Sequence, residues 1–195
     1  QLDEPFGALD AKVRQELRQW LRHLHDEIHL TSVFVTHDQD EAMELADRVL
    51  VMNQGRIEQI GTPDEVFHQP KTEFVMNFLG QVNVFHGRLE GGKVHFASLA
   101  MDSKDHTNTE DQTVRVFVRP HDFDVETHRN GHPCFRAVVK RIHSAGPNVR
   151  LDLVADSGEH LHAELPQERY RSLGIVLESQ VFVTPREVKV FANRG

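Results

Sequence analysis

The 195-residue sequence has one cysteine, Cys134, and lacks long apolar runs. A single cysteine cannot form an intrachain disulfide and excludes a zinc site built from pairs of cysteines. No apolar stretch approaches the roughly 18 residues of a membrane-spanning helix, and no charged-then-apolar leader is seen. We therefore expect a chain that neither spans a membrane nor carries a secretion signal of its own, in a reducing compartment.

Basic residues are also scarce, because 22 Lys and Arg stand against 30 Asp and Glu and leave a formal net charge of −8. Nucleic-acid-binding domains normally carry clustered Lys and Arg, so we expect no nucleic-acid partner. The imbalance lies wholly in residues 1–80, with seven basic and fifteen acidic residues, whereas residues 81–195 are balanced. This change in composition predicts a domain boundary near Gly80.

Histidine is abundant, with fourteen copies, and it is the commonest metal ligand. His23 and His25 are expected on different faces of a helix, and His160 and His162 lack an evident third ligand nearby in sequence. We favour solvated or capping histidines and predict no metal ion bound directly by them.

Residues 1–80 show mixed helix and strand patterns. Helical spacing predicts a helix over Ala11–Ile28 with Asp10 as its N-cap, and the β-branched run Ser32–Thr36 predicts a buried strand. Further elements are expected as a helix over Gln39–Ala46, a hairpin of Arg48–Met52 and Arg56–Ile60, a helix starting at Thr62-Pro63, and a helix over Thr72–Leu79 that Gly80 ends. This order is typical of an α/β layer with parallel strands.

After Gly80 the pattern changes to short strands separated by glycine-containing turns, which predicts a small barrel or sandwich. The expected strands are Val84–Leu89, Lys93–Phe96, Thr113–Val118, Phe135–Ile142, Val149–Val154, His160–Leu165, Val181–Thr184 and Val188–Ala192. The polar run Asp102–Gln112 is predicted to be a mobile loop.

One segment partly matches a phosphate-binding loop, namely Gly87-Arg-Leu-Glu-Gly-Gly-Lys-Val94. The eighth position of that pattern needs a Ser or Thr hydroxyl, and the loop must lead into a helix. Val94 has no hydroxyl, and a strand is expected from Lys93. We interpret the segment as a hairpin turn.

Acidic and histidine side chains follow two predicted strands. Asp3 and Glu4 lie at one strand end and His37 lies at another, and ligands bind at the carboxyl ends of strands in open α/β sheets. One carboxylate can hold Mg²⁺ through its water shell, the next can orient a water for attack on phosphorus, and a histidine can donate to a phosphoryl oxygen. The alternative is that the acids are merely solvated and His37 caps the following helix.

Three segments resemble the ATP-binding subunits of bacterial ABC importers. They are Leu2-Asp-Glu-Pro-Phe-Gly-Ala-Leu-Asp10, Phe34-Val-Thr-His-Asp-Gln-Asp-Glu-Ala42 and Ala46-Asp-Arg-Val-Leu-Val-Met-Asn-Gln-Gly-Arg-Ile-Glu-Gln-Ile-Gly61. The run Thr62–Phe67 and the following Phe74–Gly80 are similar to the link into the family's C-terminal domain. The resemblance is close over residues 1–80 and covers the remainder in outline.

The resemblance implies a fold for each part. Residues 1–80 would be an α/β remnant, the C-terminal part of a P-loop ATPase domain of the ABC type. Residues 81–195 would be an all-β regulatory barrel related to the OB fold, of TOBE-like or MOP-like type.

The resemblance also implies roles in the use of ATP and Mg²⁺. Asp3 matches the Walker B aspartate that holds Mg²⁺ through water, and Glu4 matches the catalytic glutamate that polarises the attacking water. His37 matches the switch histidine at the γ-phosphate, and Asp10 matches the D-loop aspartate that faces the partner subunit.

Other parts of the family's ATP site do not occur in this sequence. A usable phosphate loop, an aromatic adenine platform, a Q-loop and the Leu-Ser-Gly-Gly-Gln signature are missing, and in the family they precede the point where this sequence begins. We therefore expect a C-terminal piece of a longer subunit that is inactive as an ATPase by itself. Its first 80 residues are expected to be rearranged, partly disordered or paired with a second copy.

The join Phe78-Leu-Gly-Gln-Val-Asn-Val-Phe-His-Gly87 and the segment Phe117–Phe123 resemble the sulfate/thiosulfate members. Sugar, polyamine, iron and molybdate importers remain alternatives. The resemblance implies a peripheral location at the cytoplasmic face of the bacterial inner membrane. The implied partners are a second copy of the subunit, two membrane-spanning permease subunits and, indirectly, a periplasmic sulfate-binding protein.

The β-rich part also offers candidates for an anion site, and such a site would make a stand-alone small-anion-binding regulatory module an alternative function. The candidates are Arg119, His121, Lys140, Arg141 and His143. The competing interpretation is that these are solvated residues of the barrel.

Overall fold

The computed structural model describes residues 2–3, 11–28, 31–102, 111–129 and 131–192. The chain divides into two compact units, residues 1–79 and residues 80–195, and each is described by itself. No helix among the described residues is both long enough and apolar enough to cross a membrane.

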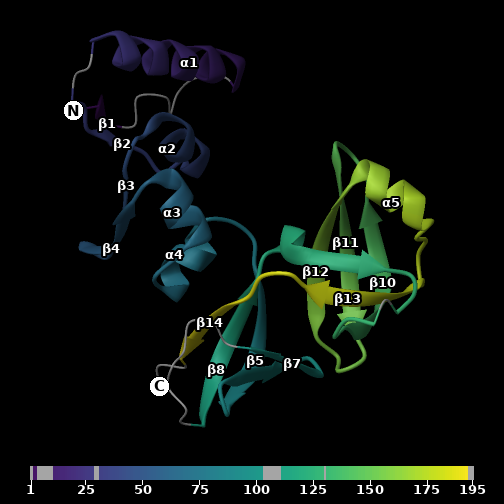
Figure 1. The fold of residues 1–195 in the computed structure, drawn as a ribbon. Helices are drawn as coiled ribbons and strands as arrows, with labels where there is room; N and C mark the ends of the chain where they lie inside the picture. The colour runs from purple at the N-terminus through teal and green to yellow at the C-terminus, as the bar shows by residue number, and fades with distance from the viewer. Residues whose placement is uncertain (1, 4–10, 29–30, 103–110, 130, 193–195) are drawn as a thin grey trace. The chain divides into compact units, whose positions relative to one another are not determined.

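The first unit mixes helices with two short sheets (Figure 1). Its elements are β1 (Leu2–Asp3), α1 (Ala11–Ile28), β2 (Phe34–Val35), α2 (Gln39–Leu45), β3 (Val49–Asn53), β4 (Arg56–Gly61), α3 (Pro63–His68) and α4 (Glu73–Phe78). Strands β1 and β2 pair in parallel, and β3 and β4 form an antiparallel hairpin in a separate sheet.

Two expectations for this unit are wrong in the described residues. The parallel layer does not extend to β3, since in the described residues β3 pairs with β4 alone. The hairpin of β3 and β4, with positive φ at Gln54 and Gly55, is the one predicted from the sequence. The strand β2 is shorter than expected and not buried, since Val35 keeps 43% of its surface exposed. In the described sheet, β1 is its one neighbour.

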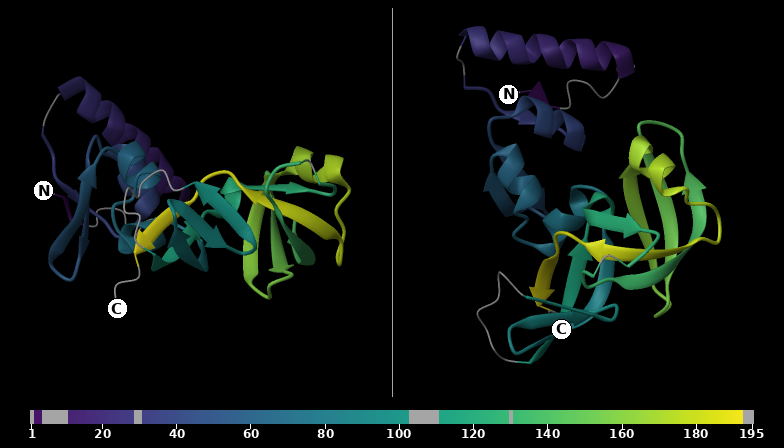
Figure 2. Two further views of the ribbon diagram at one scale, coloured as in Figure 1. Left: turned by 60° about the horizontal axis from the view of Figure 1, so that its bottom comes forward. Right: turned by 45° about the vertical axis from the view of Figure 1, so that its right-hand side comes forward.

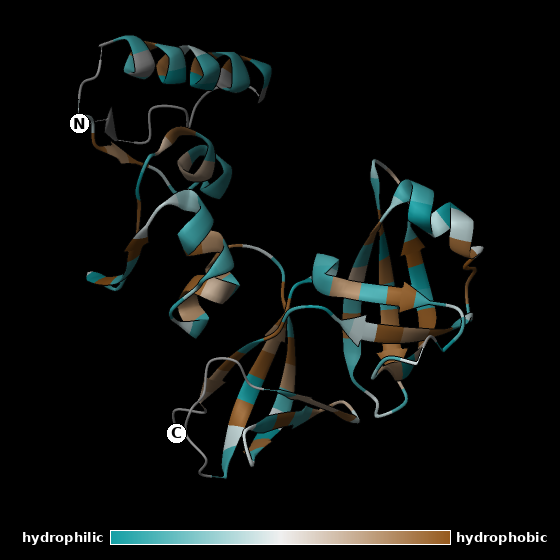
Figure 3. Cartoon of the chain, in the orientation of Figure 1, coloured by the Kyte–Doolittle hydropathy of each residue, from teal (hydrophilic) through white to brown (hydrophobic). Residues whose placement is uncertain are grey.

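The helix starts follow the sequence signals. Thr62 and Glu65 form a capping box at α3, with Pro63 at the first helical position, and Thr72 caps α4. These two helices and the hairpin share a small core of Val49, Val51, Val66, Val75 and Leu79. The described side chains of α1 do not belong to this core, and Figure 3 shows that helix as mainly hydrophilic.

The second unit is built from strands, with one short helix and one 3₁₀ turn. Its elements are β5 (Asn83–Glu90), β6 (Lys93–Phe96), β7 (Leu99–Asp102), β8 (Gln112–Val118), η1 (Pro120–Asp122), β9 (Phe123–Glu126), β10 (Phe135–His143), β11 (Asn148–Ala155), β12 (His160–Pro166), α5 (Gln167–Leu173), β13 (Gln180–Pro185) and β14 (Lys189–Ala192). The strands β7 and β9 and the helix α5 were not expected from the sequence.

Two five-stranded antiparallel sheets form this unit, with strand orders β12-β11-β10-β13-β9 and β14-β8-β5-β6-β7. The edge strands β9 and β12 of the first sheet contact each other, so this sheet curls towards a barrel. Figure 2 shows the curled strands and α5 at one end of them.

Both sheets contribute to one hydrophobic core. Phe85 of β5 packs against Phe123 and Phe135, with ring centroids 6.3 Å and 6.2 Å apart and edge-to-face geometry. The aliphatic residues of β8, β10, β11 and β13 complete this core, because alternate positions on these strands are buried.

The segment that partly matches a phosphate loop is a hairpin turn. Leu89 pairs with Val94 and Glu90 with Lys93, and the intervening Gly91 and Gly92 have φ values of +55° and +79°. This geometry confirms the interpretation made from the sequence. The predicted mobile loop Asp102–Gln112 lies mostly outside the described residues.

Candidate functional site

The parallel pair β1–β2 places two candidate positions at one edge of a sheet. Asp3 is the last residue of β1 and is in register with Val35, the last residue of β2, and His37 follows two residues later. The two strands therefore end side by side, which is the arrangement that the sequence analysis used for its candidate site. The side chain of Asp3, and Glu4 and Asp10 entirely, lie outside the described residues.

A hydrogen-bonded turn presents His37. Thr36 Oγ1 donates to Glu41 Oε2 (2.6 Å) and accepts from the backbone N–H of Asp38 (3.0 Å). The backbone N–H of Glu41 donates to Asp38 Oδ1 (3.2 Å), so Asp38 is the N-cap of α2. The alternative that His37 caps this helix is therefore wrong, and the His37 side chain is exposed.

The same turn contains a buried carboxylate that the sequence analysis did not single out. Glu41 is only 3% exposed, although it follows an exposed residue at the start of a short helix. The pattern Asp38-x-x-Glu41 could have indicated it, because an N-cap followed three residues later by Glu is a helix-start signature. The first residue of α2, Gln39, donates its side-chain amide to the carbonyl of Phe78, the last residue of α4, and this bond connects the two helices.

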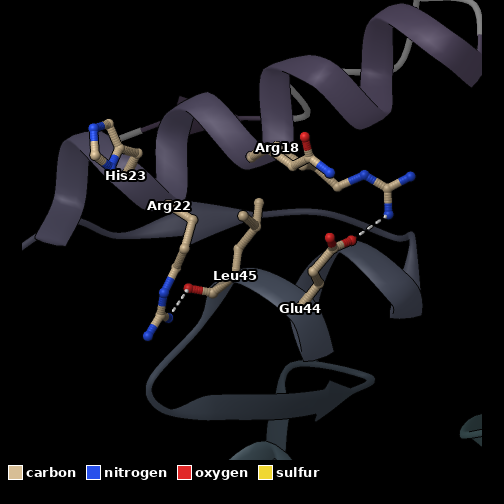
Figure 4. Close-up of a pocket in the computed structure, with 6 residues that line it drawn as sticks. Arg18, Arg22, His23, Glu44 and Leu45 are labelled. Carbon is tan, nitrogen blue, oxygen red and sulfur yellow. Dashed lines mark hydrogen bonds and ion pairs between the residues drawn. The ribbon is translucent and has the colours of Figure 1, made fainter.

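An open pocket of about 290 Å³ lies between α1 and α2 and is lined mainly by polar and charged side chains (Figure 4). Arg18 Nη1 donates to Glu44 Oε2 (3.2 Å), and Arg22 Nη1 donates to the carbonyl of Leu45 (3.1 Å) and to Asp47 Oδ1 (3.3 Å). Both arginines of this pocket thus have carboxylate partners, so the pocket lies over electrostatic contacts between α1 and the α2 region.

Two candidates for the anion site lie at η1 in the second unit. Arg119 is 6% exposed, and burial lowers the pKa of its guanidinium against the raising effect of the Asp122 and Glu187 charges. Burial raises the pKa of Asp122, which outweighs the nearby charge of His121. His121 Nε2 lies 3.9 Å from Asp122 Oδ1. This corner therefore holds carboxylates as well as cations.

The other three anion-site candidates lie on β10, and two of them pair with carboxylates. Lys140 Nζ is 2.8 Å from Glu178 Oε2, and His143 Nε2 is 3.5 Å from Asp152 Oδ2. Arg141 is in register with Asp152 across the sheet.

A cluster of His143, Asp152 and His162 was missed by the sequence analysis. His162 Nδ1 lies 2.8 Å from Asp152 Oδ1, on the side opposite His143. Burial acts to raise the pKa of Asp152, but the hydrogen bonds and charges of His162 and His143 outweigh it and hold that pKa below its ordinary value. Only the register of β10, β11 and β12 brings these residues together, and the sequence does not specify register.

No group of three or more His, Cys, Asp or Glu residues among the described ones is arranged to hold a metal ion.

Two family models match the second unit. Residues 83–125 match the CysA C-terminal regulatory domain, and residues 129–186 match the TOBE-like domain. The expectation of a TOBE-like domain in the β-rich part is thus confirmed.

Curated relatives align with the whole chain. The sulfate/thiosulfate import ATP-binding protein CysA of Nitrosomonas europaea is 52% identical over 197 residues, which covers all of this chain and 54% of the relative. The protein of the same name from Bacillus cereus is 49% identical over 191 residues, covering 97% of this chain and 54% of the relative. The chain therefore spans about half the length of these relatives.

Among solved structures, the cytoplasmic molybdate-binding protein ModG with molybdate bound aligns with 56% of this chain. The alignment covers 95% of the ModG chain, with 17% identity and a TM-score of 0.45.

The family of this chain follows from its alignments with the curated relatives. Over its whole length the chain is a homologue of the sulfate/thiosulfate import ATP-binding proteins, and it carries their C-terminal regulatory domain.

Proposed function

We propose that the chain is the C-terminal half of the ATP-hydrolysing subunit of an ABC importer for sulfate and thiosulfate. The observation that carries this proposal is the 52% identity, over the entire chain, to a protein of that name. Residues 1–80 would supply part of the ATPase domain, and residues 81–195 would be the regulatory domain. The full-length subunit would act at the cytoplasmic face of the inner membrane, with a second copy, two permease subunits and a periplasmic binding protein as partners.

Within that subunit, Asp3 would hold Mg²⁺ through water and Glu4 would polarise the water that attacks ATP. His37 would reach the γ-phosphate, and Asp10 would face the second copy. The parallel register of Asp3 with Val35 supports these roles, because it brings the end of β1 beside the turn that presents His37. Mg²⁺ binds carboxylate oxygens, so the carboxylates at this edge of the sheet would suit it. When bound, it would neutralise the phosphate charges.

The proposal includes the inactivity of residues 1–195 by themselves, since the segment Gly87–Val94 is a hairpin and cannot hold phosphates at a helix N-terminus. The test compares Mg²⁺-dependent ATP hydrolysis by the purified chain with hydrolysis by the full-length subunit. We expect hydrolysis only by the full-length subunit, and its loss in the Glu4→Gln variant. If residues 1–195 alone hydrolyse ATP, and Glu4→Gln abolishes that hydrolysis, the proposed inactivity of the chain by itself is wrong.

The transported solute needs a separate test. In a bacterium that lacks its own sulfate-importer ATP-binding subunit, the full-length protein should restore uptake of labelled sulfate and thiosulfate. Rescue of sugar, polyamine, iron or molybdate uptake without sulfate uptake would reassign the importer.

A stand-alone anion-binding module has less support, because Lys140 and His143 both face carboxylates. Calorimetry of the chain with sulfate, thiosulfate and molybdate tests it. We expect no heat of binding at millimolar anion, and a saturable signal would favour the module.

A further inference from the structure

The buried carboxylate of Glu41 has no part in the roles proposed above, and it lies four residues from His37. A glutamate is almost never fully buried unless a partner compensates for the loss of water around its carboxylate. Glu41 is 3% exposed, and its partner is the hydroxyl of Thr36, which donates to it at 2.6 Å.

The hydrogen bonds of the turn enclose His37 on both sides. Thr36 precedes it and is bound to Glu41, and Asp38 follows it and is bound through its N–H to Thr36 and through its carboxylate to the N–H of Glu41. The backbone of His37 is therefore fixed at both neighbours, while its side chain remains exposed. A short side-chain network of this kind orders the backbone of the loop that carries His37.

We propose that Thr36 and Glu41 are positioning residues that hold the backbone of His37 for its contact with the γ-phosphate. This inference rests on the proposed function, because it assigns the turn to a reaction in the full-length subunit. If a group that acts on the transferred phosphoryl is misplaced by about 1 Å, the rate can fall about 100-fold. The fixed backbone at His37 would therefore matter for turnover.

The chain offers a matched control at α4. Like Thr36, Thr72 donates its hydroxyl to a glutamate and accepts from a backbone N–H, with Thr72 Oγ1 2.9 Å from Glu58 Oε2 and 3.2 Å from the nitrogen of Val75. Unlike Thr36, it is itself the N-cap of its helix. The substitution Thr72→Val removes a hydroxyl with the same kinds of bonds as Thr36→Val. It lies at the start of α4, whereas the bond from Gln39 of α2 reaches the last residue of α4, Phe78.

The first measurement uses the chain as it is. Thr36→Val should speed amide hydrogen exchange at Asp38 at least tenfold, because it removes the acceptor of that N–H, and Thr36→Ser should keep the slow exchange. Thr72→Val should leave Asp38 unchanged. Equal exchange at Asp38 in the parent and Thr36→Val chains would overturn the proposal, even if the full-length variants fail to fold.

The second measurement uses the full-length subunit. Thr36→Val and Glu41→Gln should lower kcat for ATP hydrolysis roughly 10- to 100-fold with little change in KM, and Thr36→Ser should restore it. Thr72→Val should lower the melting temperature to a similar degree yet keep kcat within twofold. If Thr36→Val and Glu41→Gln behave like Thr72→Val, the two residues only stabilise α2 and the positioning role is wrong. If His37→Ala leaves kcat unchanged, the role of His37 in the proposed function fails instead.

Discussion

Single residues with positive φ give the most local prediction. The turn between β6 and β7 consists of Ala97 and Ser98, with φ values of +43° and +68°, so two residues with side chains occupy the left-handed region. Such a conformation costs about 1 kcal/mol per residue, and glycine avoids this cost. Ser98→Gly should therefore raise the free energy of unfolding by about 1 kcal/mol, measured by urea titration.

The reverse change at the preceding hairpin is the control. Gly92 has φ +79°, and a Cβ added there meets nothing within 4 Å, so Gly92→Ala introduces backbone strain without a clash. It should lower the free energy of unfolding by about the amount that Ser98→Gly adds. If Ser98→Gly is neutral while Gly92→Ala is destabilising, the left-handed assignment of Ser98 is contradicted.

Asn83 links the two sheets of the second unit through a buried amide. Its side chain accepts from the backbone N–H of His162 (2.7 Å) and donates to the carbonyls of His162 (2.8 Å) and Val118 (3.2 Å), so it completes the free edge of β12 as a neighbouring strand would. Asn83→Ala should lower the free energy of unfolding by about 2 kcal/mol, because buried backbone groups lose their partners. Asn148→Ala, which removes an exposed bond to Glu164, should cost under about 0.5 kcal/mol.

At the scale of elements, the three strands β10, β11 and β12 meet at Asp152. Since its folded-state pKa is lowered by His162 and His143, its contribution to stability is fully present above the unfolded pKa of about 3.9. The contribution is lost as the pH falls through the lowered folded-state pKa. The difference in unfolding free energy between the parent chain and Asp152→Asn should therefore be constant at pH 5 to 6 and shrink below about pH 4.

Chemical denaturation between pH 6 and pH 2.5 measures this difference. A difference for Asp152→Asn that grows as the pH falls would contradict the assignment.

The helix α1 is held by charges rather than by a shared core. Asp47 accepts from Arg22 (3.3 Å) and pairs with His25 (3.1 Å), and the described part of α1 adds no residue to the buried cluster. Exposed ion pairs contribute about 0.5 kcal/mol each and are screened by salt. Asp47→Asn, or 1 M NaCl, should speed amide exchange in α1 roughly fivefold while β3 and α3 stay protected. The exposed Asp40 provides the control variant Asp40→Asn, and equal exchange in the two variants would argue against the ion pairs.

The elements that the sequence predicted are those with a chemical signal at their ends. The helix starting at Thr62-Pro63 and the hairpins at Gln54-Gly55 and Gly91-Gly92 carry caps or glycines, and their bounds were predicted within a few residues. The strand β7 was missed because Ala97-Ser98 has no turn signal, and α5 was missed because its N-cap, Pro166, has no side-chain bond.

The candidate site was predictable only in part for a related reason. The alternation of strand and helix gave the positions of Asp3 and His37 at strand ends. The burial of Glu41 and the meeting of His143 with His162 depend on tertiary contacts and register, which no local pattern specifies.

At the scale of the whole molecule, the two units have separate cores of unequal size. The buried cluster of the second unit contains 24 residues of the described chain, whereas that of the first contains five. The hairpin of the first unit also leaves large apolar side chains exposed on one face, namely Leu50, Met52, Ile57 and Ile60. Because stability depends on buried apolar area, we expect the first unit to unfold at lower urea concentration than the second.

The sequence supplies one spectroscopic reporter for each unit. Trp20, the single tryptophan, lies on α1 in the first unit, and Tyr170, the single tyrosine, lies on α5 in the second. In a urea titration the Trp20 fluorescence, which reports α1 of the first unit, should change at lower urea concentration than the Tyr170 fluorescence of the second unit. A chain of residues 80–195 should keep the later transition, because its core is internal to it. Coincident transitions in the full chain, or loss of the later one from residues 80–195, would mean that the units fold as one cooperative body.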